Sequence, residues 1–371
     1  MDPARSRLCV TGLRGIPGVM GGVETHCEEL LPRVAVNAPE FEIEVLGRKP
    51  YLKDTPDRCD GVMVTPLPSP RQSHLEAIVS TAVGVAYARW TGARIIHIHA
   101  IGPAILTPLA RLMGLRVVMT HHGDDYERAK WGKFAKFALR TGERWGINCA
   151  HRVIAVSPSL ADRLAHQYPS CAGKVRYIPN GAPALSDDSL GSAEILSRFG
   201  VSARNFILAV GRFVPEKGFD YLIDAFRKSG TKRKLVIAGA ADHGSAYARK
   251  IMNEGGGNVI LTGQQPRPIL KTLYQNTDLF VLPSFHEGLP ITALEAGRCG
   301  APMLLSDIQP NRDLGLREAN YFPVGDTDAL AMKMGSPSAG FEVDAQDLNR
   351  RFDWDQIARH TLDVYREAER V

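Results

Sequence analysis

The sequence has few cysteines, and none of them is placed as in a metal site. Its six cysteines are scattered over 371 residues, and no two stand in a CxxC motif. This distribution argues against a zinc site or a disulfide framework. We therefore expect free thiols in a reducing compartment.

Long apolar runs are also lacking. The longest, at 78–88, is interrupted by Ser80, Thr81 and Gly84, whereas a membrane-spanning helix needs about 20 apolar residues. Residues 1–7 lead directly into a predicted strand and contain no apolar signal-peptide core. These absences predict a cytoplasmic protein that is soluble or peripheral on the inner face of the plasma membrane.

Neither sign of charge dominates strongly. The net charge is +5, and charged residues make up 23% of the chain. The dense basic stripe typical of nucleic-acid binding is missing, so we expect no nucleic-acid partner. The mild basicity suits an anionic small ligand or an anionic membrane surface.

What the chain does contain is a regular alternation of strand-like and helix-like segments, which predicts an α/β fold with parallel sheets. A polar stretch at 184–192 separates two Rossmann-like halves, and 353–370 reads as a capped terminal helix. Helices are predicted at 22–37 and 157–167. The predicted strands are 7–11, 42–46, 61–65, 94–99, 116–120, 152–156, 175–178, 206–210, 234–238, 258–262, 279–282 and 302–305.

Two glutamates eight positions apart, Glu287 and Glu295, follow the predicted strand at 279–282. Gly288, Leu289 and a proline separate Glu287 from an apolar segment that reads as a helix. The unpaired N–H groups of a helix N-terminus attract anions, and carboxylates accept hydrogen bonds from hydroxyl groups. The combination suits a diphosphate joined to sugars, although paired glutamates near a helix are also common as solvated charges.

Two other loops follow predicted strands. Gly21 and Gly22 stand at a helix N-terminus and allow close backbone approach, in a pattern that is neither GxGxxG nor a P-loop. Arg212 and Lys217 follow the first strand of the second half, where two cations can neutralise a leaving diphosphate. The alternatives are a flexible glycine loop, a solvated lysine and an arginine in a salt bridge.

Histidines gather at the ends of two predicted strands. His97 and His99 end one strand, and His121 and His122 end the next, followed by Asp124. No HExxH pattern accompanies them, so hydrogen bonding to a sugar or its phosphate is favoured over a metal site. His97 also fits a histidine satisfied within the core.

Residues 127–145 interleave lysines with aromatic residues at helical spacing. Basic amphipathic helices that carry tryptophan often lie at anionic membrane surfaces. The alternative is a surface helix with ordinary core contacts.

Together these loops resemble the retaining glycosyltransferases of family four, whose fold is GT-B. The resemblance implies two facing Rossmann-like domains around a cleft: 1–184 for the acceptor and 185–350 for the donor, with a helix at 351–371 that crosses back. The motifs that carry it are Gly21-Gly22, Ile178-Pro179-Asn180-Gly181, Gly211-Arg212 with Glu216-Lys217-Gly218, and Glu287-Gly288-Leu289-Pro290 with Glu295.

The resemblance also implies roles for residues. Glu295 binds the nucleotide ribose, and Glu287 lies near the donor sugar. Arg212 and Lys217 stabilise the departing diphosphate, so that neither a metal nor a cofactor is required. The implied catalytic residues are His122, Arg212, Lys217 and Glu287. The implied donor-binding residues are Gly21, Gly22, Arg212, Lys217, Glu287, Gly288, Leu289 and Glu295, and further sugar or acceptor contacts are expected from His99, His121 and Asp124.

The implied activity is transfer of a hexosyl unit from a nucleotide-diphosphate sugar, with retention of configuration and no protein nucleophile. The segment from His121 to Gly132 is similar to a bacterial polysaccharide-assembly subgroup with lipid-linked saccharide acceptors. Alternatives are a synthase of a soluble glycoside of the sucrose or trehalose type, and a catalytically silent sugar-nucleotide-binding module. Two DxD patterns, at 326–328 and 353–355, are expected to be helix starts rather than metal ligands.

Overall fold

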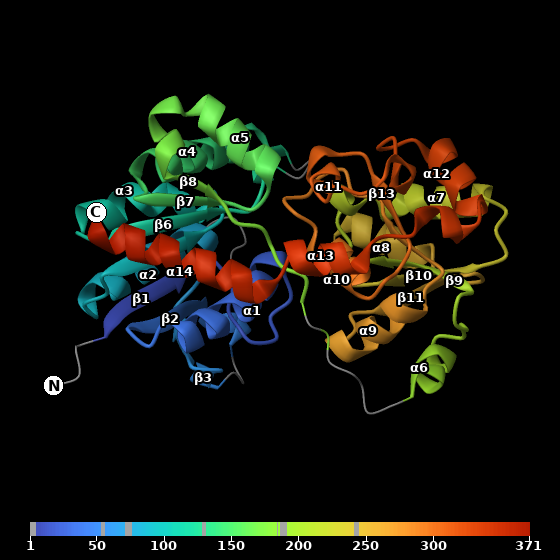
Figure 1. Cartoon of the computed structure of the whole chain (residues 1–371), viewed down its shortest axis with the longest axis horizontal. Coiled ribbons are helices and arrows are strands. Elements are labelled where there is room, and N and C mark those ends of the chain that lie inside the picture. The colour runs from blue at the N-terminus through green and yellow to red at the C-terminus, as the bar shows by residue number, and fades with distance from the viewer. Residues whose placement is uncertain are drawn as a thin grey trace. The chain divides into compact units, whose positions relative to one another are not determined.

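The computed structural model describes residues 5–52, 56–70, 76–127, 131–183, 185, 191–240 and 245–371. The chain divides into two compact units (Figure 1). The first contains Met1–Gly181 together with Asp353–Val371, and the second contains Ala182–Phe352. Most of the predicted linker at 184–192 lies outside the described residues.

The first unit is built on an eight-stranded sheet in the order β3-β4-β2-β1-β5-β6-β7-β8. Every neighbouring pair is parallel except β3 with β4. The strands are β1 (Ser6–Thr11), β2 (Phe41–Arg48), β3 (Arg58–Cys59), β4 (Val62–Leu67), β5 (Ile95–His99), β6 (Arg116–His121), β7 (Arg152–Ala155) and β8 (Val175–Tyr177).

Among the described residues of this unit, six α-helices accompany the sheet and supply connections that parallel strands require. They are α1 (Gly22–Asn37), α2 (Glu76–Trp90), α3 (Thr107–Leu112), α4 (Lys133–Cys149), α5 (Pro158–Gln167) and α14 (Trp354–Arg370). The prediction for 22–37 is confirmed to the residue, and that for 157–167 to within one residue.

The second unit has a six-stranded, wholly parallel sheet in the order β11-β10-β9-β12-β13-β14. This is the strand order of a doubly wound dinucleotide-binding sheet. Its strands are β9 (Phe206–Val210), β10 (Lys234–Ala238), β11 (Val259–Gly263), β12 (Leu279–Leu282), β13 (Met303–Ser306) and β14 (Tyr321–Phe322). Its helices are α6 (Ser192–Arg198), α7 (Phe219–Lys228), α8 (Ala246–Asn253), α9 (Arg267–Asn276), α10 (Ile291–Arg298), α11 (Gln309–Arg312), α12 (Thr327–Gly335) and α13 (Ala345–Arg351).

The central strands consist of short continuous apolar runs, as expected for parallel strands covered on both faces. Every residue of β9 and of β12 is buried. Each fully buried large side chain contributes about 1.5–3 kcal/mol. All twelve predicted strands are confirmed, whereas the two-residue strands β3 and β14 were not predicted because so short a pairing leaves no run in the sequence.

The terminal helix α14 completes the core of the first unit. Trp354, Ile357, Leu362 and Tyr365 lie in one hydrophobic cluster with residues of β1, β2 and α1. The helix begins as predicted, because the Asp353 side chain accepts a hydrogen bond from the Gln356 N–H. The first strands and the last helix of this unit therefore share one core, although they are far apart in the sequence.

Both DxD patterns are helix starts, as predicted. Asp326 caps α12 by accepting from the N–H groups of Asp328 and Ala329, and Asp353 caps α14. Within the described part of the chain, no helix is both long and apolar enough to cross a bilayer.

The packing of Gly181 against Trp354 generates a stability prediction. A Cβ on Gly181 would lie 2.5 Å from the Trp354 ring, whereas a Cβ on Gly173 would meet nothing within 4 Å. We expect Gly181→Ala to lower the free energy of unfolding by about 1–3 kcal/mol through overpacking. The measurement is urea unfolding followed by tryptophan fluorescence, with Gly173→Ala as the control. Equal unfolding midpoints for the two variants would contradict this account.

Candidate functional site

In both sheets the strand order reverses at one place, and ligands of open α/β sheets bind beyond the carboxyl ends of the strands there. In the first unit this switch point lies between β1 and β5, and in the second between β9 and β12. The Gly21-Gly22 loop follows β1, and His99 ends β5. Arg212 and Lys217 follow β9, and Glu287 follows β12. The predicted residues thus gather at the two switch points.

Lys217 and Glu287 form an ion pair at the switch point of the second unit. The Lys217 Nζ lies 2.5 Å from Glu287 Oε1, and the two side chains are 15% and 11% exposed. The Ser284 hydroxyl donates a second hydrogen bond to the same oxygen, at 2.6 Å. The alternative of a solvated lysine is therefore wrong.

Glu287 is held in its charged form. Burial by itself raises the pKa of Glu287, but the ion pair with Lys217 and the Ser284 hydroxyl outweigh burial and leave the pKa below its ordinary value. At neutral pH the loop after β12 therefore presents a carboxylate with a fixed cation beside it.

Two loops of the second unit are tied together around this ion pair. The Phe285 N–H donates to the Glu216 carbonyl at 2.9 Å. Gly218 has φ +64°, and a Cβ there would lie 2.5 Å from the Pro283 carbonyl oxygen. A side chain at this position would therefore force the two loops apart. Arg212 is half-buried in the first of these loops.

The second glutamate of the motif is buried on α10. Glu295 is 6% exposed, and its Oε2 accepts a hydrogen bond from the Tyr274 hydroxyl at 2.9 Å. Burial raises the pKa of Tyr274, and the nearby Glu295 adds to the effect, so the phenol stays a donor. Glu295 is not a solvated charge. Gly288 and Leu289 precede the first turn of α10, and Leu289 is buried.

In the first unit the glycine loop is braced by a residue that the sequence did not single out. Glu24, in the first turn of α1, accepts from the Arg14 N–H at 2.9 Å, and its Oε1 also lies 3.6 Å from Arg14 Nε. A Cβ on Gly21 would lie within contact distance of Glu24, and one on Gly12 would lie 2.3 Å from the His99 carbonyl oxygen. The loop approaches both groups closely because it carries glycine there.

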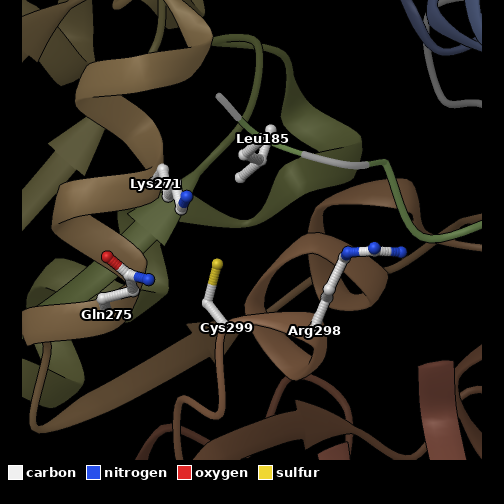
Figure 2. Close-up of a pocket in the computed structure, with 5 residues that line it drawn as sticks. All are labelled: Leu185, Lys271, Gln275, Arg298 and Cys299. Carbon is white, nitrogen blue, oxygen red and sulfur yellow. The ribbon is translucent and has the colours of Figure 1, made fainter. Parts of the chain in front are cut away.

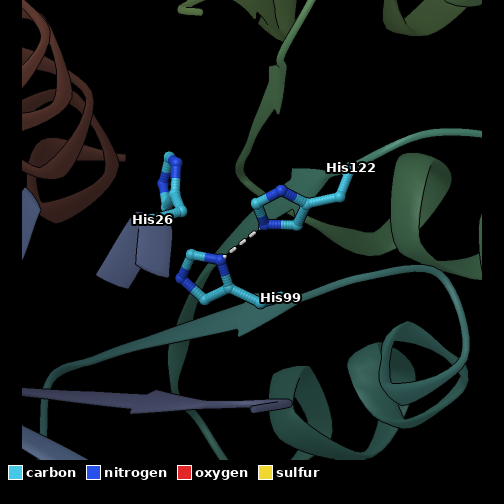
Figure 3. Close-up of side chains that lie close together, drawn as sticks. All are labelled: His26, His99 and His122. Atoms are coloured by element: carbon cyan, nitrogen blue, oxygen red, sulfur yellow. Dashed lines mark hydrogen bonds between the residues drawn. The ribbon is translucent and has the colours of Figure 1, made fainter. Parts of the chain in front are cut away.

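Three histidines from separate elements meet beside this loop (Figure 3). His26 comes from α1, His99 from the end of β5, and His122 from just after β6. His99 Nδ1 and His122 Nε2 are 2.9 Å apart. Burial lowers the pKa of His26 to about 4 and, with neighbouring histidines adding, lowers the pKa values of His99 and His122 well below their ordinary value. All three rings are neutral at pH 7.

His97 is a satisfied core histidine. Its Nδ1 lies 2.8 Å from the Tyr365 hydroxyl and its Nε2 lies 2.7 Å from the Thr120 hydroxyl. Both ring nitrogens therefore have partners within the core.

His121 and Asp124 belong to a different group, a buried ion network around Glu143 of α4. The Glu143 Oε2 lies 2.9 Å from His121 Nε2 and 3.0 Å from Arg163 Nη2. Arg163 also pairs with Asp124, and the Gly123 N–H donates to His121 Nδ1 at 3.2 Å. The structure therefore brings His99 and His122 together, whereas His121 and Asp124 belong to the separate network around Glu143.

Comparison with known protein families shows to which family the chain belongs. Residues 20–184 match the family described as glycosyltransferase family 4, and residues 196–334 match the family described as glycosyl transferases group 1. The chain belongs to the group 1 glycosyltransferases. Their two matches lie on the first and second units respectively.

Two relatives of this group 1 glycosyltransferase match over part of their length. An uncharacterized glycosyltransferase of Methanocaldococcus jannaschii is 31% identical over 58% of this chain and 60% of its own. A GDP-mannose-dependent alpha-(1-6)-phosphatidylinositol monomannoside mannosyltransferase of Mycolicibacterium smegmatis is 30% identical over 62% of this chain and 63% of its own. The chain thus spans about three fifths of each relative.

Solved structures match over nearly the whole chain. Sucrose-phosphate synthase of Thermosynechococcus elongatus has a TM-score of 0.81 at 20% identity, over 98% of this chain and 99% of that one. HepE of Anabaena in complex with UDP-glucose has a TM-score of 0.74 at 16% identity, over 97% and 99%. This likeness shows the predicted GT-B fold, with two parallel-sheet α/β domains.

A cavity of about 200 Å³ opens elsewhere in the second unit of the glycosyltransferase, between α9 and the end of α10 (Figure 2). It is lined by Leu185, Lys271, Gln275, Arg298 and Cys299. Burial, with Glu295 adding, raises the pKa of Cys299 to about 11, so its thiol stays protonated. The cavity contains none of the predicted donor residues and offers no activated nucleophile.

Sequence reasoning missed the residues that hold the predicted ones in place. Two of them had a local signal: Glu24 is an acid in a first helical turn, and Ser284 stands two residues after a strand. The others contact their partners only through the fold. They are His26, Tyr274, Glu143 and Arg163.

The network around Glu143 generates a pH prediction. Burial opposes the charge of Glu143, but hydrogen bonds from His121 and Arg163 lower its pKa from 4.5 to about 2. Because the folded pKa is the lower one, the carboxylate stabilises the fold fully above pH 4.5 and loses this effect as the pH falls toward 2. The contribution is roughly 3 kcal/mol, at about 1.4 kcal/mol per pKa unit.

We therefore expect Glu143→Gln to lower the free energy of unfolding by about 3 kcal/mol at pH 6, and the gap from the parent to close toward pH 2. Urea unfolding at several pH values measures this difference in the free energy of unfolding. The control is Asp162→Asn, an exposed carboxylate on α5 next to Arg163. A gap that stays constant with pH would show that Glu143 carries no such proton linkage.

Proposed function

We propose that the chain is a retaining hexosyltransferase. It moves a hexosyl unit from a nucleotide-diphosphate sugar to a lipid-linked saccharide acceptor, in the synthesis of a cell-surface polysaccharide at the cytoplasmic face of the membrane. The observation that carries the proposal is the buried Lys217–Glu287 ion pair at the switch point of the second sheet. It supplies a cation for a leaving diphosphate and a carboxylate for a sugar.

The donor is bound by the second unit in this proposal. Lys217 and Arg212 neutralise the diphosphate, and the N–H groups of Gly288 and Leu289, before the N-terminus of α10, add further donors. Glu295 binds the ribose in an orientation supported by Tyr274. The complex of HepE with UDP-glucose supports a nucleotide sugar as donor for this fold.

Transfer proceeds with retention on one face of the sugar. The bond from the anomeric carbon to the diphosphate oxygen breaks, the acceptor hydroxyl oxygen bonds to that carbon from the same face, and its proton passes to the departing diphosphate. Glu287, already paired with Lys217, stabilises positive charge on the sugar and forms no covalent intermediate. Because Lys217 and Arg212 neutralise the leaving group, the reaction needs no metal ion.

We assign the acceptor to the first unit. His99 and His122 end or follow neighbouring strands there, and the Gly21-Gly22 loop follows β1 of the same sheet. Neutral imidazoles can both donate and accept hydrogen bonds, which suits sugar hydroxyl groups. His122 therefore acts on the reacting groups in this proposal, and His99 supports it through their hydrogen bond.

The outer face of α4 supports a lipid-linked acceptor. Phe134 and Phe137 are 85% and 68% exposed, and Trp145 is 45% exposed. Lys133, Arg140 and Arg144 are exposed on the same helix. Exposed aromatic residues among cations favour the interface of an anionic membrane. The Mycolicibacterium relative is, by its name, a phosphatidylinositol monomannoside mannosyltransferase, which supports a lipid acceptor.

Two observations favour the proposal over its alternatives: the exposed face of α4 and the buried Lys217–Glu287 pair. A synthase of soluble glycosides has no use for exposed phenylalanines, although the fold of sucrose-phosphate synthase is shared. A silent sugar-nucleotide-binding module does not need the buried Lys217–Glu287 pair, whose charges are costly to bury. Both observations favour the membrane-associated transferase.

The ion pair is tested by substitution. We expect Lys217→Ala to reduce transfer at least 100-fold, because one electrostatic contact to a developing charge contributes about 10²–10³ in rate. Wild-type protein is first screened for hydrolysis of UDP-, GDP- and TDP-sugars, and the variant is assayed with the donor found. The control is Lys228→Ala, an exposed lysine on α7. Undiminished turnover in Lys217→Ala, or an equal loss in the control, would remove the proposed donor site.

The membrane face is tested with vesicles. We expect Lys133→Glu with Lys136→Glu to weaken binding to anionic vesicles roughly 30-fold or more, since each lysine near the surface contributes about 1 kcal/mol. Lys130 is left unchanged because it lies outside the described residues. A matched charge change, Lys228→Glu with Lys250→Glu on α7 and α8, serves as control. Equal co-sedimentation of both double variants would exclude α4 as the membrane contact.

A further inference from the structure

The three histidines of the first unit offer more than hydrogen bonds. His26, His99 and His122 each present one ring nitrogen, and these three nitrogens lie within 4.8 Å of one another. His26 and His99 are 2% and 0% exposed, while His122 is only partly buried. Three buried or half-buried imidazoles from α1, the end of β5 and the residue after β6 form an unusual donor set (Figure 3).

We propose that His26, His99 and His122 bind one divalent transition-metal ion of the zinc class through three ring nitrogens. Three histidines with an open fourth position are a known ligand set of zinc. The proposal concerns binding alone and does not depend on the proposed transfer reaction. An ion at this place would occupy nitrogens of His99 and His122 and would replace the hydrogen bond through which His99 supports His122 in the proposed acceptor site.

The hydrogen bonds around the cluster select the ring tautomers that coordination needs. The Asn180 Oδ1 lies 2.9 Å from His26 Nδ1. Because an amide oxygen only accepts, His26 carries its proton on Nδ1 and has its lone pair on Nε2. Histidine ligands of metals almost always donate their other ring N–H to such an acceptor.

His99 has a similar partner on its far side. Its Nε2 lies 3.6 Å from the Cys27 Sγ, and in the tautomer with the proton on Nε2 that proton points at the sulfur. In this tautomer the Nδ1 lone pair faces His122 Nε2, from which it is 2.9 Å distant. Without an ion, one proton must lie between these two nitrogens. An ion replaces that proton and uses both lone pairs.

The distances require a modest adjustment. Zinc–nitrogen bonds of about 2.0–2.1 Å in a tetrahedral site put ligand nitrogens roughly 3.3 Å apart. The His99–His122 pair must open slightly, and the widest separation, within 4.8 Å, must contract. His122 follows β6 outside the regular strand and is partly exposed, so its ring is the one with room to rotate.

The chemistry of the ligands selects the ion. Imidazole nitrogen suits zinc, cobalt, nickel and copper, whereas magnesium and calcium prefer oxygen. A second cluster, His121 with Asp124 and Glu143, has the spacing of a cation site as well. There the Arg163 guanidinium already pairs with both carboxylates. A metal ion at that cluster would face a like charge, which favours the three histidines.

Cobalt provides the test because its visible absorption reports its coordination. Tag-free full-length protein is titrated with Co²⁺, and we expect one equivalent to give a visible spectrum that Zn²⁺ abolishes. His26→Gln and His99→Gln should each abolish this spectrum. Asn180→Ala keeps all three ligands and should weaken binding about 10–100-fold, as loss of a partner that orients a ligand does. The matched control is His166→Gln, an exposed histidine on α5, and should bind as the parent does.

Three outcomes would overturn the proposal. The first is the absence of a stoichiometric Co²⁺ spectrum in the parent protein. The second is a spectrum that persists in a correctly folded His26→Gln or His99→Gln. The third is a spectrum that disappears with Asp124→Asn, which would place the ion at the second cluster. Far-UV circular dichroism establishes whether the variants fold. If both histidine variants misfold, unchanged Co²⁺ affinity in Asn180→Ala would contradict the proposal.

Discussion

Parallel pairing is the constraint from which the rest of this structure follows. Except for the β3–β4 pair, every strand lies parallel to its neighbours, so each connection must return along the length of the sheet. The central strands are covered on both faces and are therefore largely apolar, and the buried Glu44 of β2 is held there by hydrogen bonds from Thr65 and Tyr87. The ends of the strands and the loops beyond them therefore carry most of the candidate residues. His99 is the last residue of β5, His122 follows β6, and the Lys217–Glu287 pair of the second unit lies in the loops after β9 and β12.

The sequence predicted the elements well because their signals are local. Runs such as 206–210, 234–238 and 279–282 are apolar and bounded by polar or turn residues, and they coincide with β9, β10 and β12. The motif glutamates were also found from spacing alone. Family resemblance then gave them roles that no spacing can supply.

The contacts that hold the candidate residues could not be predicted, because they join distant parts of the chain. His26 meets Asn180 across 154 positions, and Lys217 meets Glu287 across 70. The helix at 133–149 illustrates the same limit. Its composition predicted a basic surface, yet Gly142 and Gly146 let one side pack closely, and Glu143 is buried there against Arg163, an imidazole and two phenols. Burial of a carboxylate inside a basic helix has no local signature.

That helix has a structural consequence. Its exposed aromatic residues and its buried carboxylate lie on opposite sides of one rigid rod, and about 15 Å of axis separates Lys133 from Glu143. Glu143 in turn contacts His121, the last residue of β6, directly before His122. One side-chain contact therefore joins the helix that carries the exposed aromatic residues to the end of the strand that His122 follows. The position of α4 and the position of the strand end beside His122 are thus linked through Glu143.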